Sequence, residues 1–312
     1  MRAVPDVMIL DTASLYYRSF YALPSSMTAP DGHPHNAIRG LLQTIERLRQ
    51  RWQPTTLIAA WDNDWRPDWR VELLAGYKTH RLADEGDSTE DEPDELSPQI
   101  HGIHTILTAW GIPVVGVDGF EADDVAGTLA WQAAQQGLST IVVTGDRDFV
   151  QLVGDSTTVL MTAKGGMDNW LPLDVAAVRE RFGVSPDRYL DVAALRGDPS
   201  DGLPGVPGVG EKTAVRLIQH FGDLAGVQRA CTEDPPVKPL TPRLAGLISD
   251  HADYLRAAMQ VSAIRLDVPI PKADSIVKTG IPSSPADPHQ WDDAVDEWGV
   301  RRFAKAAMDL NS

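Results

Sequence analysis

The chain has 312 residues, a formal net charge of −16 and a hydrophobic content of 43%, which is typical of a globular protein with a large core. Cys231 is its only cysteine, so intramolecular disulfides and thiolate zinc sites are excluded. No basic segment followed by an apolar one opens the chain, and no apolar run could span a bilayer. We therefore expect no secretory signal, no membrane partner and a cytoplasmic location.

Several short apolar runs along the chain each end in an acid. The runs span residues 6–10, 55–61 and 139–143, and the acids that follow them are Asp11, Asp62, Asp146 and Asp148. Such runs are typical of buried parallel strands, whose carboxyl ends present side chains at one edge of a sheet. Because ligands bind beyond that edge in open α/β sheets, we expect these acids to converge on one site.

Amphipathic helices separate the predicted strands. Apolar residues recur at helical spacing over residues 37–51, 96–110 and 123–136, and further strands are predicted at 112–117 and 157–161. Strands that alternate with helices indicate an α/β fold with a mostly parallel central sheet.

Cations and aromatic rings are interleaved over residues 62–81. They include Arg66, Arg70, Lys78 and Arg81 with Trp65, Trp69 and Tyr77. This mixture suits single-stranded nucleic acid, although a solvated helix face with a few buried aromatics explains it too. Arg18, near the first strand end, could meet a phosphate or stack on a surface tyrosine. Residues 84–95 include eight acids and no apolar side chain, which predicts a mobile loop.

The stretch from Glu121 to Asp124 contains three carboxylates directly before a helical pattern. In a helix that begins near Glu121, Glu121 and Asp124 share a face and Asp123 lies at its edge. Acids also suit any first helical turn because they complement the helix dipole, so a plain charged helix start is an alternative. With Asp198 and Asp201 in a later loop, nine acids are candidate ligands, and so many anions need cations such as Mg²⁺ or Mn²⁺.

A Gly/Pro-rich loop joins a predicted helix at 187–196 to another at 214–220. Its glycines would let backbone N–H groups approach a phosphate, and a lysine and the helix N-terminus add positive charge. The residues concerned are Gly205, Gly208, Gly210 and Lys212. This pattern predicts a helix–hairpin–helix that grips the backbone of duplex DNA, with a rigid turn as the alternative. Helices at 243–264 and 290–310 and a short strand at 266–270 complete the prediction.

The net charge at first argues against a nucleic-acid partner. The nine candidate ligands and the eight acids of residues 84–95 account for that charge, so the rest of the chain is close to neutral. Bound divalent cations would also make the site electropositive. Net charge therefore decides nothing about this class of partner.

Taken together, these residues resemble the flap endonuclease or 5′-nuclease family, including the 5′-3′ exonuclease domain of bacterial DNA polymerase I. The matching segments are Asp11, 17–18, 61–62, 77–81, 121–124, 144–149, 197–214 and 262–269. They extend over nearly the whole chain, and the resemblance is to a stand-alone form because no polymerase segment follows. Thr12, Trp61 and Gly202 stand where the family usually has Gly, Phe and Asn, but no departure removes a carboxylate.

The resemblance implies a PIN-like 5′-nuclease core over residues 1–180, with a helical arch at about 64–95, and a helix–hairpin–helix region with C-terminal helices over 181–312. It implies two divalent metal ions, Mg²⁺ or Mn²⁺, and a K⁺ ion at the hairpin. The metal ligands would be Asp11, Asp62, Glu121, Asp123, Asp124, Asp146, Asp148, Asp198 and Asp201. Lys78, Arg18 and Arg81 would act at the scissile phosphate, while Arg70, Tyr77 and the hairpin residues would bind DNA.

The implied function is a structure-selective 5′ nuclease, both exonuclease and flap endonuclease, that hydrolyses DNA by two-metal catalysis in replication and repair. Its partner would be DNA with a 5′ flap, a nick or a 5′ end, including RNA-primed ends, and the protein would be a monomer. Two alternatives use only part of the pattern. A non-catalytic DNA-junction binder would not need nine acids, and a metal-dependent phosphatase or RNase would not need the hairpin.

Overall fold

The computed structural model describes residues 4–83 and 90–309. Its centre is a six-stranded sheet in the order β3-β2-β1-β4-β5-β6, in which β6 is antiparallel to β5 and the other pairs are parallel. The strands are β1 (Val7–Asp11), β2 (Thr56–Ala60), β3 (Val114–Val115), β4 (Thr140–Thr144), β5 (Thr157–Met161) and β6 (Leu171–Leu173). The predicted α/β class with a mostly parallel sheet is confirmed.

Both faces of the sheet are buried, as the continuous apolar runs predict. In β1, Val7 and Ile9 belong to one core, and Met8 and Leu10 belong to the other, because successive side chains point to opposite faces. Helix α5 (Ala122–Gln135) covers the first face. The second face is covered by α1 (Thr12–Ala22), α2 (Asn36–Trp52), α4 (Ser97–Trp110), α13 (Pro288–Glu297) and α14 (Arg301–Met308).

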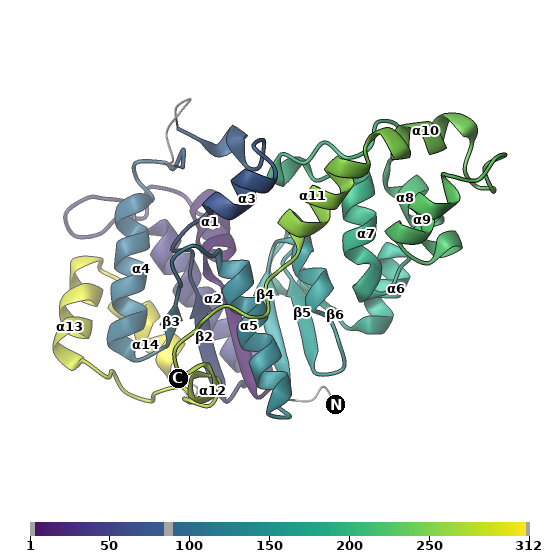
Figure 1. Cartoon of the computed structure of the whole chain (residues 1–312). Coiled ribbons are helices and arrows are strands. Elements are labelled where there is room, and N and C mark those ends of the chain that lie inside the picture. The colour runs from purple at the N-terminus through teal and green to yellow at the C-terminus, as the bar shows by residue number, and fades with distance from the viewer. Residues whose placement is uncertain (1–3, 84–89, 310–312) are drawn as a thin grey trace.

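A helical region lies beside the β5–β6 edge of the sheet (Figure 1). It contains α6 (Val175–Phe182), α7 (Pro186–Arg196), α8 (Glu211–Phe221), α9 (Leu224–Ala230), α10 (Pro242–Asp250) and α11 (Ala252–Ser262). After α11 the chain returns across α5 to the short helix α12 (Ala273–Ile276). The core on the α5 side continues into these helices through residues such as Tyr189 and Leu217, so the helical region is packed firmly on the sheet.

The predicted arch contains α3 (Asp68–Leu73) and a 3₁₀ turn over Thr79–Arg81. Helix α3 lies above the carboxyl ends of the strands, close to α11 (Figure 1). The loop expected at 84–95 falls partly outside the described residues. In its described part, Glu90 forms an isolated β-bridge with Leu82.

Several expected elements differ from the structure. The strand expected at 112–117 pairs only at Val114 and Val115. The helix expected at 243–264 is two helices separated at His251, and the one expected at 290–310 is interrupted at Gly299, where φ is 61°. Residues 266–270 form no strand, because the backbone N–H of Val268 bonds to a helix side chain, Thr128, instead of a neighbouring strand. Among the described helices, none is long and apolar enough to cross a membrane.

Candidate active site

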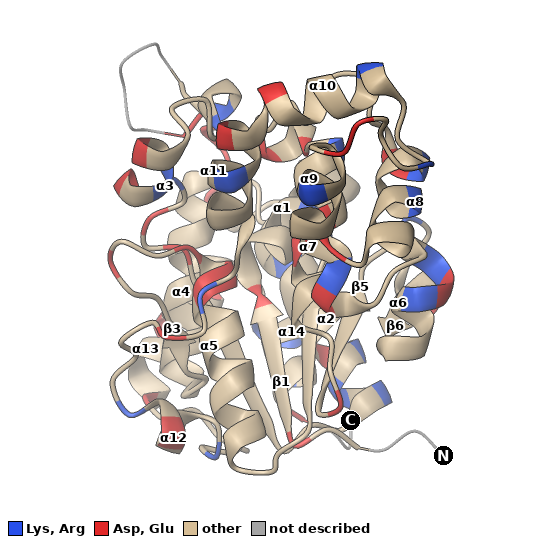
Figure 2. Cartoon of the chain, turned by 45° about the vertical axis from the view of Figure 1, so that its right-hand side comes forward, with Lys and Arg blue, Asp and Glu red and all other residues tan. Residues whose placement is uncertain are grey.

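The carboxyl ends of three neighbouring strands bring predicted acids together. Asp11 ends β1 opposite Ala60 of β2, and Asp62 and Asp146 follow β2 and β4. A cavity of about 1280 Å³ opens at this edge. Seven of the nine predicted acids line it: Asp11, Asp62, Glu121, Asp123, Asp146, Asp198 and Asp201. Figure 2 shows acidic segments gathered above the carboxyl end of β1.

Asp11 and Asp62 are held by donors from neighbouring segments. Asp11 is 7% exposed; it accepts a hydrogen bond of 2.5 Å from the Thr144 hydroxyl and caps the start of α1. Asp62 accepts from the backbone N–H of Ala122 at 2.7 Å. Burial, reinforced by repulsion from nearby acids, raises the pKa of Asp11 to about 7 and that of Asp62 to about 6. Such a group of anions favours a nearby cation.

The acidic stretch forms the start of α5, as predicted, with Glu121 at the N-cap position and Asp123 and Asp124 in the first turn. All three carboxylates meet the guanidinium of Arg70 from α3, at 2.7 Å for Glu121, 3.4 Å for Asp123 and 2.8 Å for Asp124. Asp124 is fully buried, and its Oδ2 has no hydrogen-bond partner. The arch helix is thereby fixed to the acidic helix start.

Lys78 lines the cavity and is buried. Its backbone has a left-handed φ of 49°, and its Nζ contacts Glu121 and donates to the carbonyl of Trp65 at 3.1 Å. Burial alone would lower the pKa of Lys78, but Glu121 and Asp201 outweigh it, so the pKa lies above its ordinary value. Lys78 and Arg70 in turn hold the pKa of Glu121 below its ordinary value despite its burial. This geometry keeps a charged ammonium group beside the acids.

The second predicted group of acids comes from two loops. Asp146 accepts from the backbone N–H of Asp148 at 2.9 Å, and Asp198 meets Arg196 at 3.2 Å. Burial raises the pKa of Asp201 to about 7, and burial with repulsion from Asp146 and Asp201 raises that of Asp148 well above its ordinary value. The backbone N–H of Lys78 donates to the carbonyl of Asp201 at 2.9 Å, which joins this loop to the arch.

Arg70 and Tyr77 do not lie where DNA contacts were expected. Arg70 is 1% exposed and Tyr77 is 2% exposed, and the Tyr77 hydroxyl donates to Glu121 at 2.8 Å. Both side chains therefore support the acids. Arg70 does not line the cavity, and Tyr77 lines it with almost all of its surface buried. Tyr77 thus fits the alternative of a buried aromatic ring, whereas Arg70, buried among three carboxylates, fits neither the DNA contact nor the solvated helix face.

Arg18 and Arg81 do line the cavity. Arg18 donates to the carbonyl of Ala163 and lies over the ring of Trp170, with 5.8 Å to its centroid. Arg81 is half-exposed; it donates to the carbonyl of Ser200 at 2.8 Å and lies 3.7 Å from Asp201. With Lys78, the two arginines place positive charge opposite the carboxylates.

The glycine loop connects α7 to α8, as the predicted helix–hairpin–helix requires. Gly205 and Gly208 have φ values of 69° and 81°, which L side chains rarely adopt, and Gly210 is the N-cap residue of α8. A Cβ on Gly205 would lie 2.3 Å from the carbonyl oxygen of Arg196. Lys212 is exposed in the first turn of α8. The start of α8 is thus exposed from Gly210 to Lys212, which adds a cation to it.

Other cavity residues were not predicted. Arg147 and Arg196 line it, as do Tyr21 and two acids of the arch, Glu90 and Glu92. Arg147 lies between two predicted acids in the sequence, and Arg196 lies two residues before a third. This proximity in sequence could have indicated that both arginines line the cavity. Tyr21 is 71% exposed and stacks on Tyr17, with 6.5 Å between ring centroids. The wall thus combines aromatic rings with charges of both signs.

The donor set fits hard divalent cations. Its members are carboxylate oxygens, which Mg²⁺ and Mn²⁺ prefer, and their raised pKa values reflect burial and mutual repulsion that a cation would relieve. Among residues 4–83 and 90–309, no three Asp, Glu, His or Cys side chains already stand as a coordination sphere. Hydrogen bonds and the ion pairs with Arg70 and Lys78 occupy many of the carboxylate oxygens instead.

Comparison with known sequences identifies relatives over most of the chain. A family described as "5′-3′ exonuclease, N-terminal resolvase-like domain" matches residues 6–183, and one described as "5′-3′ exonuclease, C-terminal SAM fold" matches residues 184–283. A 5′-3′ exonuclease of Streptomyces coelicolor is 48% identical over 94% of this chain and 96% of its own length. DNA polymerase I of Mycobacterium tuberculosis is 43% identical over 72% of this chain but only 24% of its own length.

Solved structures share the fold. The flap endonuclease of bacteriophage T5, in a complex with DNA and metal ions, covers 97% of this chain with a TM-score of 0.64 and 18% identity. The catalytic core of Rad2 in complex with DNA covers 97% of this chain with a TM-score of 0.55 and 17% identity. At these identities the similarity concerns the arrangement of helices and strands.

Proposed function

The chain belongs to the 5′-3′ exonuclease family, and from its cavity and hairpin we propose that it cuts the 5′ strand of DNA at flaps, nicks and 5′ ends. Hydrolysis of phosphodiesters is the activity of the family. The observation that carries the proposal is the cavity at the strand ends, where carboxylates face Lys78, Arg18 and Arg81. A non-catalytic junction binder would have no use for this arrangement.

We assign two divalent cations to the acids of the cavity, with Mg²⁺ or Mn²⁺ as candidates. Asp11, Asp62 and Glu121, with Asp123 and Asp124, would hold one ion, and the other four acids would hold the second. Asp124 and Asp148 do not line the cavity in this structure; they are buried directly behind the acids that do. When bound, such ions activate a water and stabilise the leaving oxygen.

The cations of the cavity would bind the scissile phosphate. Lys78 is the strongest candidate, because its Nζ is held among carboxylates and its pKa is raised, so it stays charged. Arg18 and Arg81 lie on the same cavity and would fix neighbouring phosphates. Tyr17 and Tyr21 offer rings on which an unpaired base could stack.

The hairpin would hold the duplex beside the cavity. Gly205, Gly208, Gly210 and Lys212 would contact the phosphate backbone, with a K⁺ ion as a further candidate at this loop. We also propose that the nuclease core spans residues 1–180 and the DNA-gripping region 181–312, and that the protein acts as a monomer on DNA or RNA-primed 5′ ends. Its bacterial relatives support a cytoplasmic location.

A 5′-end-labelled flap duplex, compared with the matched single strand, tests the proposal. Both are incubated with Mg²⁺, with Mn²⁺ or with EDTA. We expect metal-dependent cutting near the junction that is much faster on the flap than on the single strand. Equal rates on both substrates would contradict the proposal that the hairpin holds the duplex. Tight flap binding without cutting would contradict the proposed nuclease activity.

A further inference from the structure

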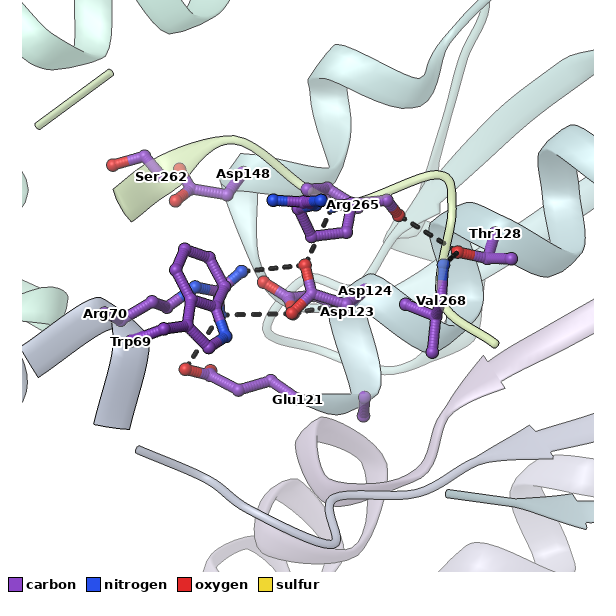
Figure 3. Close-up of polar contacts among 12 residues, drawn as sticks. Trp69, Arg70, Glu121, Asp123, Asp124, Thr128, Asp148, Ser262, Arg265 and Val268 are labelled. Carbon is purple, nitrogen blue, oxygen red and sulfur yellow. Dashed lines mark hydrogen bonds and ion pairs between the residues drawn. The ribbon is translucent and has the colours of Figure 1, made fainter. Parts of the chain in front are cut away.

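An extended segment at the end of α11 packs against the buried acids Asp124 and Asp148. This strap, residues 262–270, begins at the last residue of α11, runs toward α12 and contacts α5 and the segment after β4, which both carry predicted acids (Figure 3). Ile264, Val268 and Ile270 are buried in the core on the α5 side. None of the proposed metal ligands lies in the strap. Its backbone is nevertheless hydrogen-bonded to Asp124, and to the side chains of Thr128 and Gln151.

Gln151 attaches the strap to the segment after β4. Its Nε2 donates to the carbonyl of Asp148 at 2.9 Å and to that of Ser262 at 3.0 Å. Its Oε1 accepts from the backbone N–H of Ile264 at 3.0 Å. One side chain thus joins the backbone of a buried acid to two positions of the strap.

Thr128 attaches the strap to α5, one helical turn beyond Asp124. The hydroxyl of Thr128 donates to the carbonyl of Arg265 at 3.2 Å and accepts from the backbone N–H of Val268 at 3.1 Å (Figure 3). Arg265 is also bonded to the acid itself: its backbone N–H donates to Asp124 Oδ1 at 2.8 Å. The same oxygen accepts from Arg70 at 2.8 Å, so strap and arch meet on one carboxylate.

The fit against α5 is close. A Cβ on Gly127 would lie 2.4 Å from Ile264 Cγ2 and 3.1 Å from the carbonyl oxygen of Arg265. The side chain of Arg265 is paired with Asp267 at 3.0 Å and lies over the ring of Trp69 in the arch, 5.9 Å from its centroid. The strap therefore has little room to shift along the helix.

The strap is also continuous with the hairpin through α11. The backbone N–H of Gly205 donates to the hydroxyl of Tyr254 in α11 at 2.8 Å. Near the other end of that helix, Val261 packs in a small cluster with Tyr77 and Leu203. The element that sets the position of the strap is thus fixed both to the hairpin and to the arch.

We propose that Thr128 and Gln151 are positioning residues that dock the strap and thereby set Asp124 and the segment of Asp148 for metal binding. This inference rests on the proposed metal role of the acids. Neither side chain lines the cavity, so both act through other residues. Groups that orient metal ligands from behind commonly change metal affinity or activity by about 10- to 100-fold when removed.

Thr128→Val tests the role of the hydroxyl, because it keeps the branched shape and removes both bonds. Calorimetric titration with MnCl₂ should show about 10-fold weaker binding in the folded variant, with flap affinity in EDTA unchanged. Thr128→Ser keeps the hydroxyl and should restore nearly wild-type Mn²⁺ affinity. Thr105→Val is a matched control, since its hydroxyl only donates to the carbonyl of His101 at 3.0 Å within α4.

Gln151→Leu provides an independent test from the other side of the strap. It should weaken Mn²⁺ binding to a similar extent and raise the Mg²⁺ concentration needed for half-maximal cutting. If both variants melt at lower temperature but bind Mn²⁺ with wild-type affinity, the strap is merely structural and the proposal is wrong. Failure of the proposed function would look different, because the wild-type protein itself would neither bind Mn²⁺ nor cut.

Discussion

Arg70 is the counter-ion of three acids, and its buried positive charge offsets the repulsion among their carboxylates. A single guanidinium, 1% exposed, meets Glu121, Asp123 and Asp124. In sequence this arginine is one of several cations among aromatics, and nothing in that pattern separates a buried partner of acids from a cation that binds DNA. The distinction depends on α3 packing over the strand ends, which is a tertiary property.

Arg70→Met should therefore destabilise the protein by about 3–5 kcal/mol, because it leaves buried carboxylates without their partner. Urea unfolding monitored by circular dichroism measures this change. Arg256→Met is a matched control, since Arg256 is exposed and its ion pair, at 2.9 Å, is with the equally exposed Asp253; its cost should be below about 1 kcal/mol. Equal effects of the two substitutions would contradict the structural role of Arg70.

Lys78 lines the cavity with the predicted acids, but the sequence did not indicate which groups its side chain contacts. Its Nζ contacts Glu121, and the left-handed backbone and the carbonyl of Trp65 fix its direction. If it stabilises charge on the reacting phosphate, Lys78→Ala should lower kcat by about 10²- to 10³-fold while leaving flap binding largely intact. Steady-state cleavage over a range of flap concentrations measures kcat and KM, with the exposed Lys305→Ala as control. A loss confined to KM would show that Lys78 only binds substrate.

At the scale of elements, a sequence pattern predicts where a side chain lies when the geometry of the strand or helix fixes that place. Acids at the ends of apolar runs came together because parallel strands end at one edge of the sheet, as Asp11 and Asp62 show. The predicted helix boundaries were wrong where two amphipathic helices follow each other directly, as at His251. The helical spacing of apolar residues continues across that break, so the sequence predicts one helix. The strap was mistaken for a strand because β-branched residues also suit an extended segment packed on a helix.

The hairpin makes its own prediction. Gly205 needs a left-handed backbone and lies against Arg196, so Gly205→Ala should distort the α7–α8 connection at a cost of about 1–3 kcal/mol and weaken duplex binding. Gly246→Ala is the control, because Gly246 lies within α10 with open space around it and alanine favours a helix. Fluorescence anisotropy of a labelled duplex in EDTA measures affinity. Undiminished binding by folded Gly205→Ala would contradict the hairpin as the duplex grip.

For the whole molecule, the acidic cavity, the arch and the hairpin are connected parts of one structure. The arch contacts the acids through Arg70, the loop after α7 through Asp201, and α11 joins the hairpin to the strap. The sequence indicated each of these parts separately, and the resemblance indicated their order. How they touch could not be predicted, because it depends on side chains far apart in the chain, such as Gln151 and Ser262.

The most direct test of the central claim is single-turnover cleavage of a 5′-flap duplex in Mg²⁺ by the wild-type protein and by Asp146→Asn. This change keeps the size of a side chain that lines the cavity and removes its charge. Asp253→Asn, at an exposed position on α11, is the control. If the acids of the cavity bind the catalytic ions, Asp146→Asn should cut at least about 100-fold more slowly, while the control cuts at the wild-type rate. Cleavage by folded Asp146→Asn at the wild-type rate would show that the cavity is not the active site.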